Sequence, residues 1–174
     1  MNQDMDEIVK IAWVPQKLGD AVACVCADGT LSLWEEVAED AQPLQWKLCT
    51  SFNSGSAQLL DTQYRVSPVG LKMVTAYSDA RVKLYELMNP LELKNWQLQA
   101  EFQSVIDSVS TVGHAICIIY LGIHKGKKSQ ESIFVLGFNL KTPQLNSTEV
   151  WEFDQAHQRW LPVAELASPG DNGD

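Results

Sequence analysis

The sequence predicts an all-β fold in which repeated four-stranded antiparallel units stack like the blades of a propeller. The phrase ADGTLSLWEEV at residues 27–37 returns as SDARVKLYELM at residues 78–88, which places Tyr85 where the earlier copy has Trp34. Each copy lies in a unit of about 50 residues with several short β-rich runs separated by turn residues. Self-similarity at such a period is typical of units that bury their faces against one another.

The first unit, approximately residues 6–53, is expected to form strands over residues 7–14, 21–27, 30–37 and 44–52. Asp28 and Gly29 separate the second and third of these runs. An Asp-Gly pair in that place is a strong hairpin signal and predicts a type I′ turn, in which both central residues have positive φ. Cys24 and Cys26 are two positions apart, so they are expected to share one face of their strand.

The second unit, approximately residues 54–103, repeats this order, with strands expected over residues 59–66, 71–77, 81–87 and 95–102. Asp79 opens its central hairpin. Ala80 stands where the first unit has Gly29, and alanine tolerates positive φ less well than glycine, so the turn type stays open here.

The third unit, approximately residues 104–168, is a looser copy that places Phe153 at the position of Trp34. The three units together define one partial propeller over residues 1–168, and residues 169–174 are expected to form a flexible acidic tail.

An aromatic residue followed by an acidic one recurs in the units, as Trp-Glu, Tyr-Glu and Phe-Asp, and corresponds to the Trp-Asp dipeptide of WD40 repeats. Runs such as residues 21–27 and 71–77 are apolar on both faces, which favours blades covered on both sides over an extended sandwich. The residues that carry the structural repeat motif are Asp28, Gly29, Trp34, Asp79, Tyr85 and Phe153. The tryptophans expected to pack between strands or blades are Trp34, Trp46, Trp96 and Trp160.

The composition is that of a globular protein, with 45% hydrophobic and 20% charged residues. The formal net charge of -9 disfavours direct nucleic-acid binding. The longest apolar stretch, residues 115–123, is too short for a transmembrane helix, and no signal segment opens the sequence, so we expect a soluble intracellular protein. In that setting the four cysteines are expected to be reduced core residues.

No catalytic, cofactor or metal site is predicted. The segment GIHKGKKS at residues 122–129 fails the spacing of a phosphate loop and is expected to be a Lys-rich hairpin loop. His114 and Cys117 lack the second ligand pair that a zinc site needs. No nucleophile elbow occurs, and the glycosylation pattern at Asn146 is discounted without a signal peptide.

Longer phrases identify a family. The segments IVKIAWVP, GDAVACVCADGTLSLWEE, AYSDARVKLYELMNPLELKNWQLQAEFQ and VWEFDQAHQRWLPVAELASPGDNGD closely resemble the Seh-type nucleoporin, the Sec-thirteen homologue, in its plant form. The resemblance covers nearly all of the chain and implies a WD40 propeller left open, so that a partner protein donates a blade by β-augmentation. It also implies a non-enzymatic scaffold in the Y-shaped outer-ring coat of the nuclear pore, with roles in protein and mRNA transport.

The sequence departs from this family in three ways. It begins where an earlier blade would be complete and stops where more blades would follow, so it looks like an internal portion of the propeller. Residues 112–130 do not resemble the family's usual strand, which leaves the innermost strand of the third blade in doubt. Three units cannot close a ring, so we expect a curved row of sheets with two exposed blade faces.

Other functions stay open. The same fold could serve as an adaptor that recruits substrates to a ligase, or as part of a coat-like, TORC-regulating nutrient-signalling complex in the cytoplasm or at the vacuolar membrane. An enzyme with its site on the top loops would need convergent polar residues there, which the sequence does not show. A truncated product without a retained role is the remaining alternative.

Overall fold

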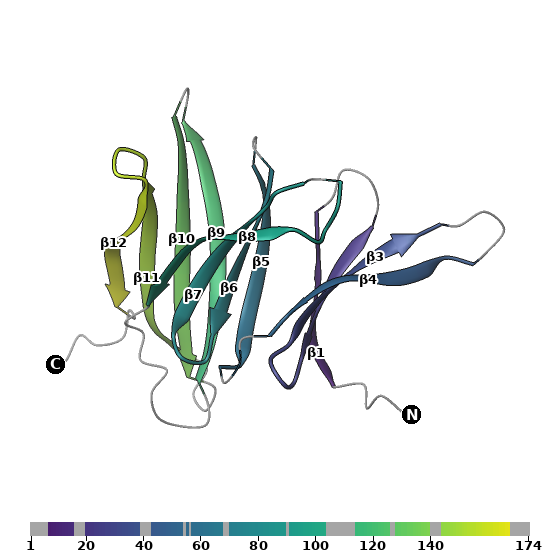
Figure 1. Cartoon of the computed structure of the whole chain (residues 1–174). Coiled ribbons are helices and arrows are strands. Elements are labelled where there is room, and N and C mark those ends of the chain that lie inside the picture. The colour runs from purple at the N-terminus through teal and green to yellow at the C-terminus, as the bar shows by residue number, and fades with distance from the viewer. Residues whose placement is uncertain are drawn as a thin grey trace.

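A computed structural model describes residues 7–15, 20–38, 43–53, 55, 57–67, 70–89, 91–103, 114–125, 128–139 and 144–167. The described residues form three four-stranded antiparallel sheets, each built from strands consecutive in the sequence (Figure 1). The first sheet contains β1 (Ile8–Trp13), β2 (Ala21–Cys26), β3 (Leu31–Val37) and β4 (Gln45–Phe52). The second contains β5 (Leu59–Ser67), β6 (Gly70–Tyr77), β7 (Arg81–Leu87) and β8 (Trp96–Gln103). The third contains β9 (His114–Lys125), β10 (Lys128–Asn139), β11 (Gln144–Asp154) and β12 (Arg159–Ala167).

This architecture confirms the predicted fold class, an incomplete WD40-type β-propeller. The eight strands of the first two sheets begin and end within about two residues of their predicted bounds. The central strands β2 and β6 carry apolar residues on both faces, and turn residues bound each run.

The third sheet has the innermost strand that the sequence left in doubt. β9 pairs with β10 from His114 opposite Asn139 to Lys125 opposite Lys128. The sequence predicts a hairpin loop over residues 122–129. The structure places much of that segment in β9 and β10 instead, so the strands extend further than expected.

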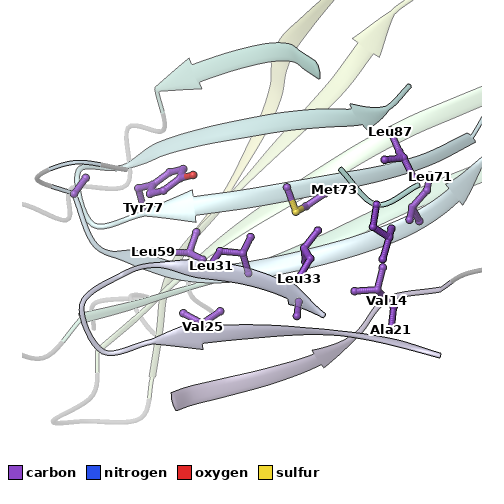
Figure 2. Close-up of a cluster of buried hydrophobic side chains, with 13 residues drawn as sticks. Val14, Ala21, Val25, Leu31, Leu33, Leu59, Leu71, Met73, Tyr77 and Leu87 are labelled. Atoms are coloured by element: carbon purple, nitrogen blue, oxygen red, sulfur yellow. The ribbon is translucent and has the colours of Figure 1, made fainter. Parts of the chain in front are cut away.

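The three sheets lie side by side in sequence order (Figure 1). A first core cluster joins the first and second sheets, and its largest fully buried members include Leu33 and Met73. Figure 2 shows this cluster, with side chains such as Val25 and Leu31 from one sheet directed at Leu59 and Tyr77 from the next. The first sheet therefore buries one face against the second.

A second core cluster joins the second and third sheets. Its members include Val74 and Leu84 of the second sheet and Ile133 of the third. Across this interface the rings of Phe102 and Trp151 stack with centroids 4.2 Å apart. The second sheet is thus covered on both faces, as expected for the central member of a stack of blades.

Candidate functional site

The central hairpins of the first two sheets share one loop geometry. The amide of Gly29 donates to the carbonyl of Cys26 at 2.9 Å, and the amide of Ala80 donates to the carbonyl of Tyr77 at 3.0 Å. Gly29 has φ +84° and Ala80 has φ +62°. The repeat thus holds at backbone level even where glycine is replaced by alanine.

The predicted type I′ turn is wrong. Asp28 is not among the described non-glycine residues with positive φ, whereas a type I′ turn needs positive φ at both Asp28 and Gly29. The loop instead has three residues, and its last residue alone is left-handed, which is the common hairpin with a G1 bulge. An Asp-Gly pair suits both geometries, so the sequence could not separate them.

The aspartates Asp28 and Asp79 fix these loops. Asp28 accepts hydrogen bonds from the amide and the hydroxyl of Thr30, both at 2.8 Å. Asp79 accepts from the amide of Arg81 at 3.2 Å and forms an ion pair with its guanidinium. Burial raises the pKa of Asp79, but the hydrogen bonds and charge of Arg81 outweigh it, so the pKa lies below its usual value. Both aspartates thus bond to a residue of their own turn, two positions further along the chain.

The repeat aromatics occupy equivalent faces with different neighbours. Tyr85 packs against the first core cluster, and its ring centroid lies 5.5 Å from that of Phe52 in the first sheet. Phe153 packs against the second core cluster, where its ring centroid lies 5.6 Å from that of Trp160. Each of these two aromatics therefore faces the sheet that precedes its own.

Trp34 lies on the corresponding face of the first sheet. It alternates with Leu33, which is fully buried in the first core cluster, so the indole lies on the opposite face. Its Nε1 donates to Ser32 Oγ at 2.9 Å. No described segment of the chain forms a sheet in front of this face.

A row of apolar residues crosses this uncovered face, which we call the open face of the first sheet. Directly opposed residues of neighbouring strands lie on the same face, and the pairs here run in the order Trp13, Val22, Trp34 and Leu48. Trp13 is 59% exposed and Leu48 is 47% exposed, and nearby on the same sheet Ile11 is 63% exposed. Isolated exposed apolar side chains are ordinary, but a contiguous apolar sheet face is typical of an interface.

The second sheet carries the same row at the equivalent positions, Tyr64, Met73, Tyr85 and Leu98. There three of the four positions are covered, because Met73 is fully buried and Tyr64 and Tyr85 pack against the first core cluster, whereas Leu98 at the outer strand is 46% exposed. The covering surface is the first sheet itself. The open face of the first sheet thus carries the same kind of residues, at equivalent positions, as a face that another β-sheet covers.

Trp46 was expected to pack between strands or blades, and this expectation was wrong. Trp46 is 45% exposed, whereas Trp160 is 9% exposed and belongs to the second core cluster. Trp96 packs against the first core cluster, as expected. The difference arises because Trp46 lies in the first sheet outside the described packing interface, a context that the residue type alone does not reveal.

Cross-sheet ion pairs were not predicted. Lys10 on β1 pairs with Asp61 on β5, whose side chain is 3% exposed. Lys72 on β6 pairs with Glu131 on β10 at 2.8 Å, and both side chains are 14% exposed. Each pair links two neighbouring sheets. A sequence with one ordinary Lys and one ordinary acid in separate units offers no signal for such pairs.

The cysteines whose side chains the structure describes are reduced thiols; Cys26 and Cys49 are partly exposed, so the expected core position holds for Cys24 alone. Cys24 and Cys26 share one face of β2, as predicted, and Cys24 is buried. Burial raises the pKa of the thiols of Cys24 and Cys49, and the Glu35 carboxylate raises that of Cys49 further. Thiols with raised pKa are poor nucleophiles at neutral pH. The side chain of Cys117 lies outside what the structure describes.

Within the described ranges, no group of three or more His, Cys, Asp or Glu side chains has the arrangement of a metal site. His157 contacts its neighbour Asp154, with Nδ1 and Oδ2 2.6 Å apart, in the β11–β12 turn. This contact lowers the pKa of Asp154. In the same described ranges there is no helix with the length and apolarity that crossing a membrane requires.

These features define the class of protein: a partial WD40-type propeller whose distinctive surface is an uncovered blade face. No protein-family model matches the chain. Over 170 residues, 96% of this chain, the sequence is 59% identical to Protein SEH1 of Arabidopsis thaliana, of which the match covers 52%. Nucleoporin SEH1 of Saccharomyces cerevisiae is 31% identical over 99 residues, which are 55% of this chain and 28% of that protein. Nucleoporin SEH1-A of Xenopus laevis is 18% identical over 168 residues, which are 93% of this chain and 44% of that protein.

The chain is therefore similar to Protein SEH1 over nearly all of its own length, and the resemblance seen in the sequence is confirmed. It spans about half the length of the first of these curated relatives. The yeast and frog relatives are named as nucleoporins.

Proposed function

We propose that this chain is a non-enzymatic scaffold component of the outer-ring coat of the nuclear pore, located at the nuclear envelope. The nucleoporin names of its relatives support this function. Each sheet would be one blade, with blades at approximately residues 6–53, 54–103 and 104–168. No residue would act chemically, and the chain would contribute packing surfaces and sheet edges.

The open face of the first sheet carries the proposal. Its apolar row matches, position by position, the row of the second sheet in which Tyr64, Met73 and Tyr85 pack against the first core cluster. A surface built to be covered by a sheet is best satisfied by another strand-rich blade, and an outer-ring nucleoporin is proposed to donate it. Pairing along strand edges would add backbone hydrogen bonds to this contact.

Affinity capture tests this proposal. The tagged full chain is expressed in its own cells, and the bound proteins are identified by mass spectrometry. The chain is expected to recover outer-ring nucleoporins in stable proportion. Recovery of chaperones alone, or of a nutrient-signalling complex without nucleoporins, would contradict the proposal.

A matched pair of variants tests the surface. Ile11→Glu places a charge beside the apolar row on the open face, where Ile11 is 63% exposed. Leu91→Glu makes the same change at a side chain that is 67% exposed in the loop between β7 and β8. Ile11→Glu should remove nucleoporin capture while Leu91→Glu should retain it. Equal recovery by both variants would show that the open face is not the interface.

A further inference from the structure

A groove of about 480 Å³ opens between the second and third sheets. Its apolar walls include Leu84 and Phe102 from the second sheet and Phe153 and Trp160 from the third. Its lining also contains the carboxylates of Glu86, Glu101 and Glu131 and the cations of Lys72 and Arg159. An apolar floor with a few charged groups at the margin is the usual composition of a binding groove.

The corresponding space between the first and second sheets is filled by the chain itself. Leu33 and Glu35 of the first sheet hold the repeat positions of Leu84 and Glu86. Leu33 is fully buried in the first core cluster, and the same cluster contains Leu93, which is 2% exposed. Leu93 belongs to the connection between β7 and β8. This leucine from the second sheet therefore closes the space at the first interface.

The shape of this connection explains how Leu93 reaches the core. The amide of Met88 donates to the carbonyl of Asn95 at 2.9 Å, which closes the loop at its base. The Trp96 indole donates to the Leu93 carbonyl at 3.2 Å and holds the leucine in place. The third sheet has a different connection, since residues 155–158 form a tight turn between β11 and β12. That turn supplies no counterpart of Leu93, which leaves the second interface open as the groove.

A basic residue accompanies the leucine at the first interface. Cys49 donates to Glu35 Oε2 at 3.5 Å and packs against the first core cluster. Burial and Glu35 raise the pKa of the Cys49 thiol, and the positive charge of Lys94 offsets part of this rise. Lys94 therefore lies close enough to act on the Cys49–Glu35 pair. The first interface is thus occupied by Leu93, and the exposed Lys94 follows it directly in the chain.

The charges of the groove favour a similar occupant. Lys72 and Glu131 pair with each other at 2.8 Å and cancel. Glu101 is likewise neutralised, because it pairs with Arg81 and with Lys83, both at 3.7 Å, which leaves Glu86 and Arg159 as the remaining charges of the lining. Among the described residues Glu86 has no ion-pair partner. A cationic side chain next to an apolar one would match this arrangement.

We propose that the groove between the second and third sheets binds a short segment of a partner protein that presents a leucine side chain next to a lysine or arginine. The leucine enters between Leu84, Phe153 and Trp160, and the basic side chain faces Glu86. This site lies at a different interface from the open face of the first sheet, and it does not depend on the nuclear-pore assignment.

The test uses the full chain and a fluorescent peptide that copies residues 86–97, ELMNPLELKNWQ. Fluorescence anisotropy should give saturable binding with a Kd between roughly 0.1 and 1 mM, the range expected for a short peptide that buries one anchor. A peptide with Leu93→Ala should bind about tenfold more weakly or worse. Absence of saturable binding, or equal binding of the two peptides, would overturn the proposal.

Matched protein variants locate the site. Glu86→Lys should weaken the peptide about threefold to tenfold, an effect that shrinks in high salt, because it replaces an attractive charge with a repulsive one. Glu35→Lys makes the same change at the equivalent position of the first interface and should leave peptide affinity unchanged. An equal effect of both variants would count against the groove.

A photo-crosslinking version of the peptide, with benzophenone at the Leu93 position, completes the test. Adducts on residues 99–102 or 158–160 would support the site. Adducts concentrated on β1 or β4 would instead show that the peptide binds the open face of the first sheet, and the proposal would be wrong.

Discussion

Gly29 offers a quantitative test of how the first hairpin packs on the second sheet. Its φ is +84°, and a Cβ added there would lie 2.9 Å from the Cα of Gln58 and 3.0 Å from the amide nitrogen of Leu59. Gly29→Ala is therefore opposed by two separate costs. Alanine must adopt a left-handed backbone, and its Cβ must overlap backbone atoms of Gln58 and Leu59 at the start of β5. Side-chain motion cannot relieve the overlap, because the neighbouring atoms belong to the main chain.

The magnitude follows from these terms. A left-handed backbone destabilises an alanine by about 1–2 kcal/mol. Alanine also lowers the entropy of the unfolded chain relative to glycine, which stabilises the folded variant by about 0.4–1 kcal/mol. Displacing the backbone of Gln58 should cost a further 1–3 kcal/mol, roughly as overpacking does. We therefore expect Gly29→Ala to lower the free energy of unfolding by about 2–4 kcal/mol.

Two control variants separate the terms. Gly55 has φ +75° with nothing within 4 Å of an added Cβ, so Gly55→Ala should cost only about 0.5–1.5 kcal/mol. Ala80 holds the equivalent position with φ +62°, and it is 5% exposed. Ala80→Gly removes the strain of a left-handed alanine, but it also loses a buried methyl group and increases the entropy of the unfolded chain. These effects oppose one another, so the free energy of unfolding should change by less than about 1 kcal/mol.

Equilibrium urea unfolding of the four proteins, monitored by tryptophan fluorescence, provides the assay. The expected order of stability is wild type and Ala80→Gly together, then Gly55→Ala, then Gly29→Ala. Equal losses at Gly29 and Gly55 would refute the contact between the first hairpin and Gln58.

Three further predictions concern the interface of the second and third sheets and the loss of stability at low pH. Phe102→Ala should lower the free energy of unfolding by about 3–5 kcal/mol, because it removes a stacked ring on Trp151 and leaves a cavity; a loss under 1 kcal/mol in urea unfolding would contradict this stacking. A double-mutant cycle of Lys72→Met and Glu131→Gln should give a coupling energy of about 1–2 kcal/mol, since both side chains are 14% exposed, and strictly additive effects would argue against the ion pair. The pKa of Asp79 is lowered in the folded state, so its carboxylate stabilises the fold above the unfolded pKa of about 3.9, and this contribution is lost as pH falls through the folded value. The free energy of unfolding, measured in urea, should therefore fall less between pH 5 and pH 3 for Asp79→Asn than for the wild type. An equal fall in both proteins would contradict the lowered pKa of Asp79.

The sequence predicted the repeat and its strands well, because both depend on local signals. Alternation of apolar residues and turn residues placed the eight strands of the first two sheets. The equivalence of Trp34, Tyr85 and Phe153 follows from spacing, and the structure places all three on the corresponding face of their sheets. Those roles need no knowledge of which sheets are neighbours.

Features that depend on neighbouring sheets could not be read from the sequence. Trp46 has the same residue type as Trp96, yet Trp46 is 45% exposed, whereas Trp96 packs against the first core cluster. Leu93 looks like an ordinary loop residue, and only packing reveals that it closes the space between two sheets. The pairing of Lys72 with Glu131 likewise joins residues far apart in the chain.

The central claim is that the second sheet is covered on both faces while the first sheet has an open face. Hydrogen–deuterium exchange of the isolated full chain tests this most directly, because β2 and β6 are equivalent central strands of the first and second sheets. The account predicts slower exchange in β6, where side chains on both faces are buried, than in β2. Equal protection of the two strands, or greater protection of β2, would contradict it.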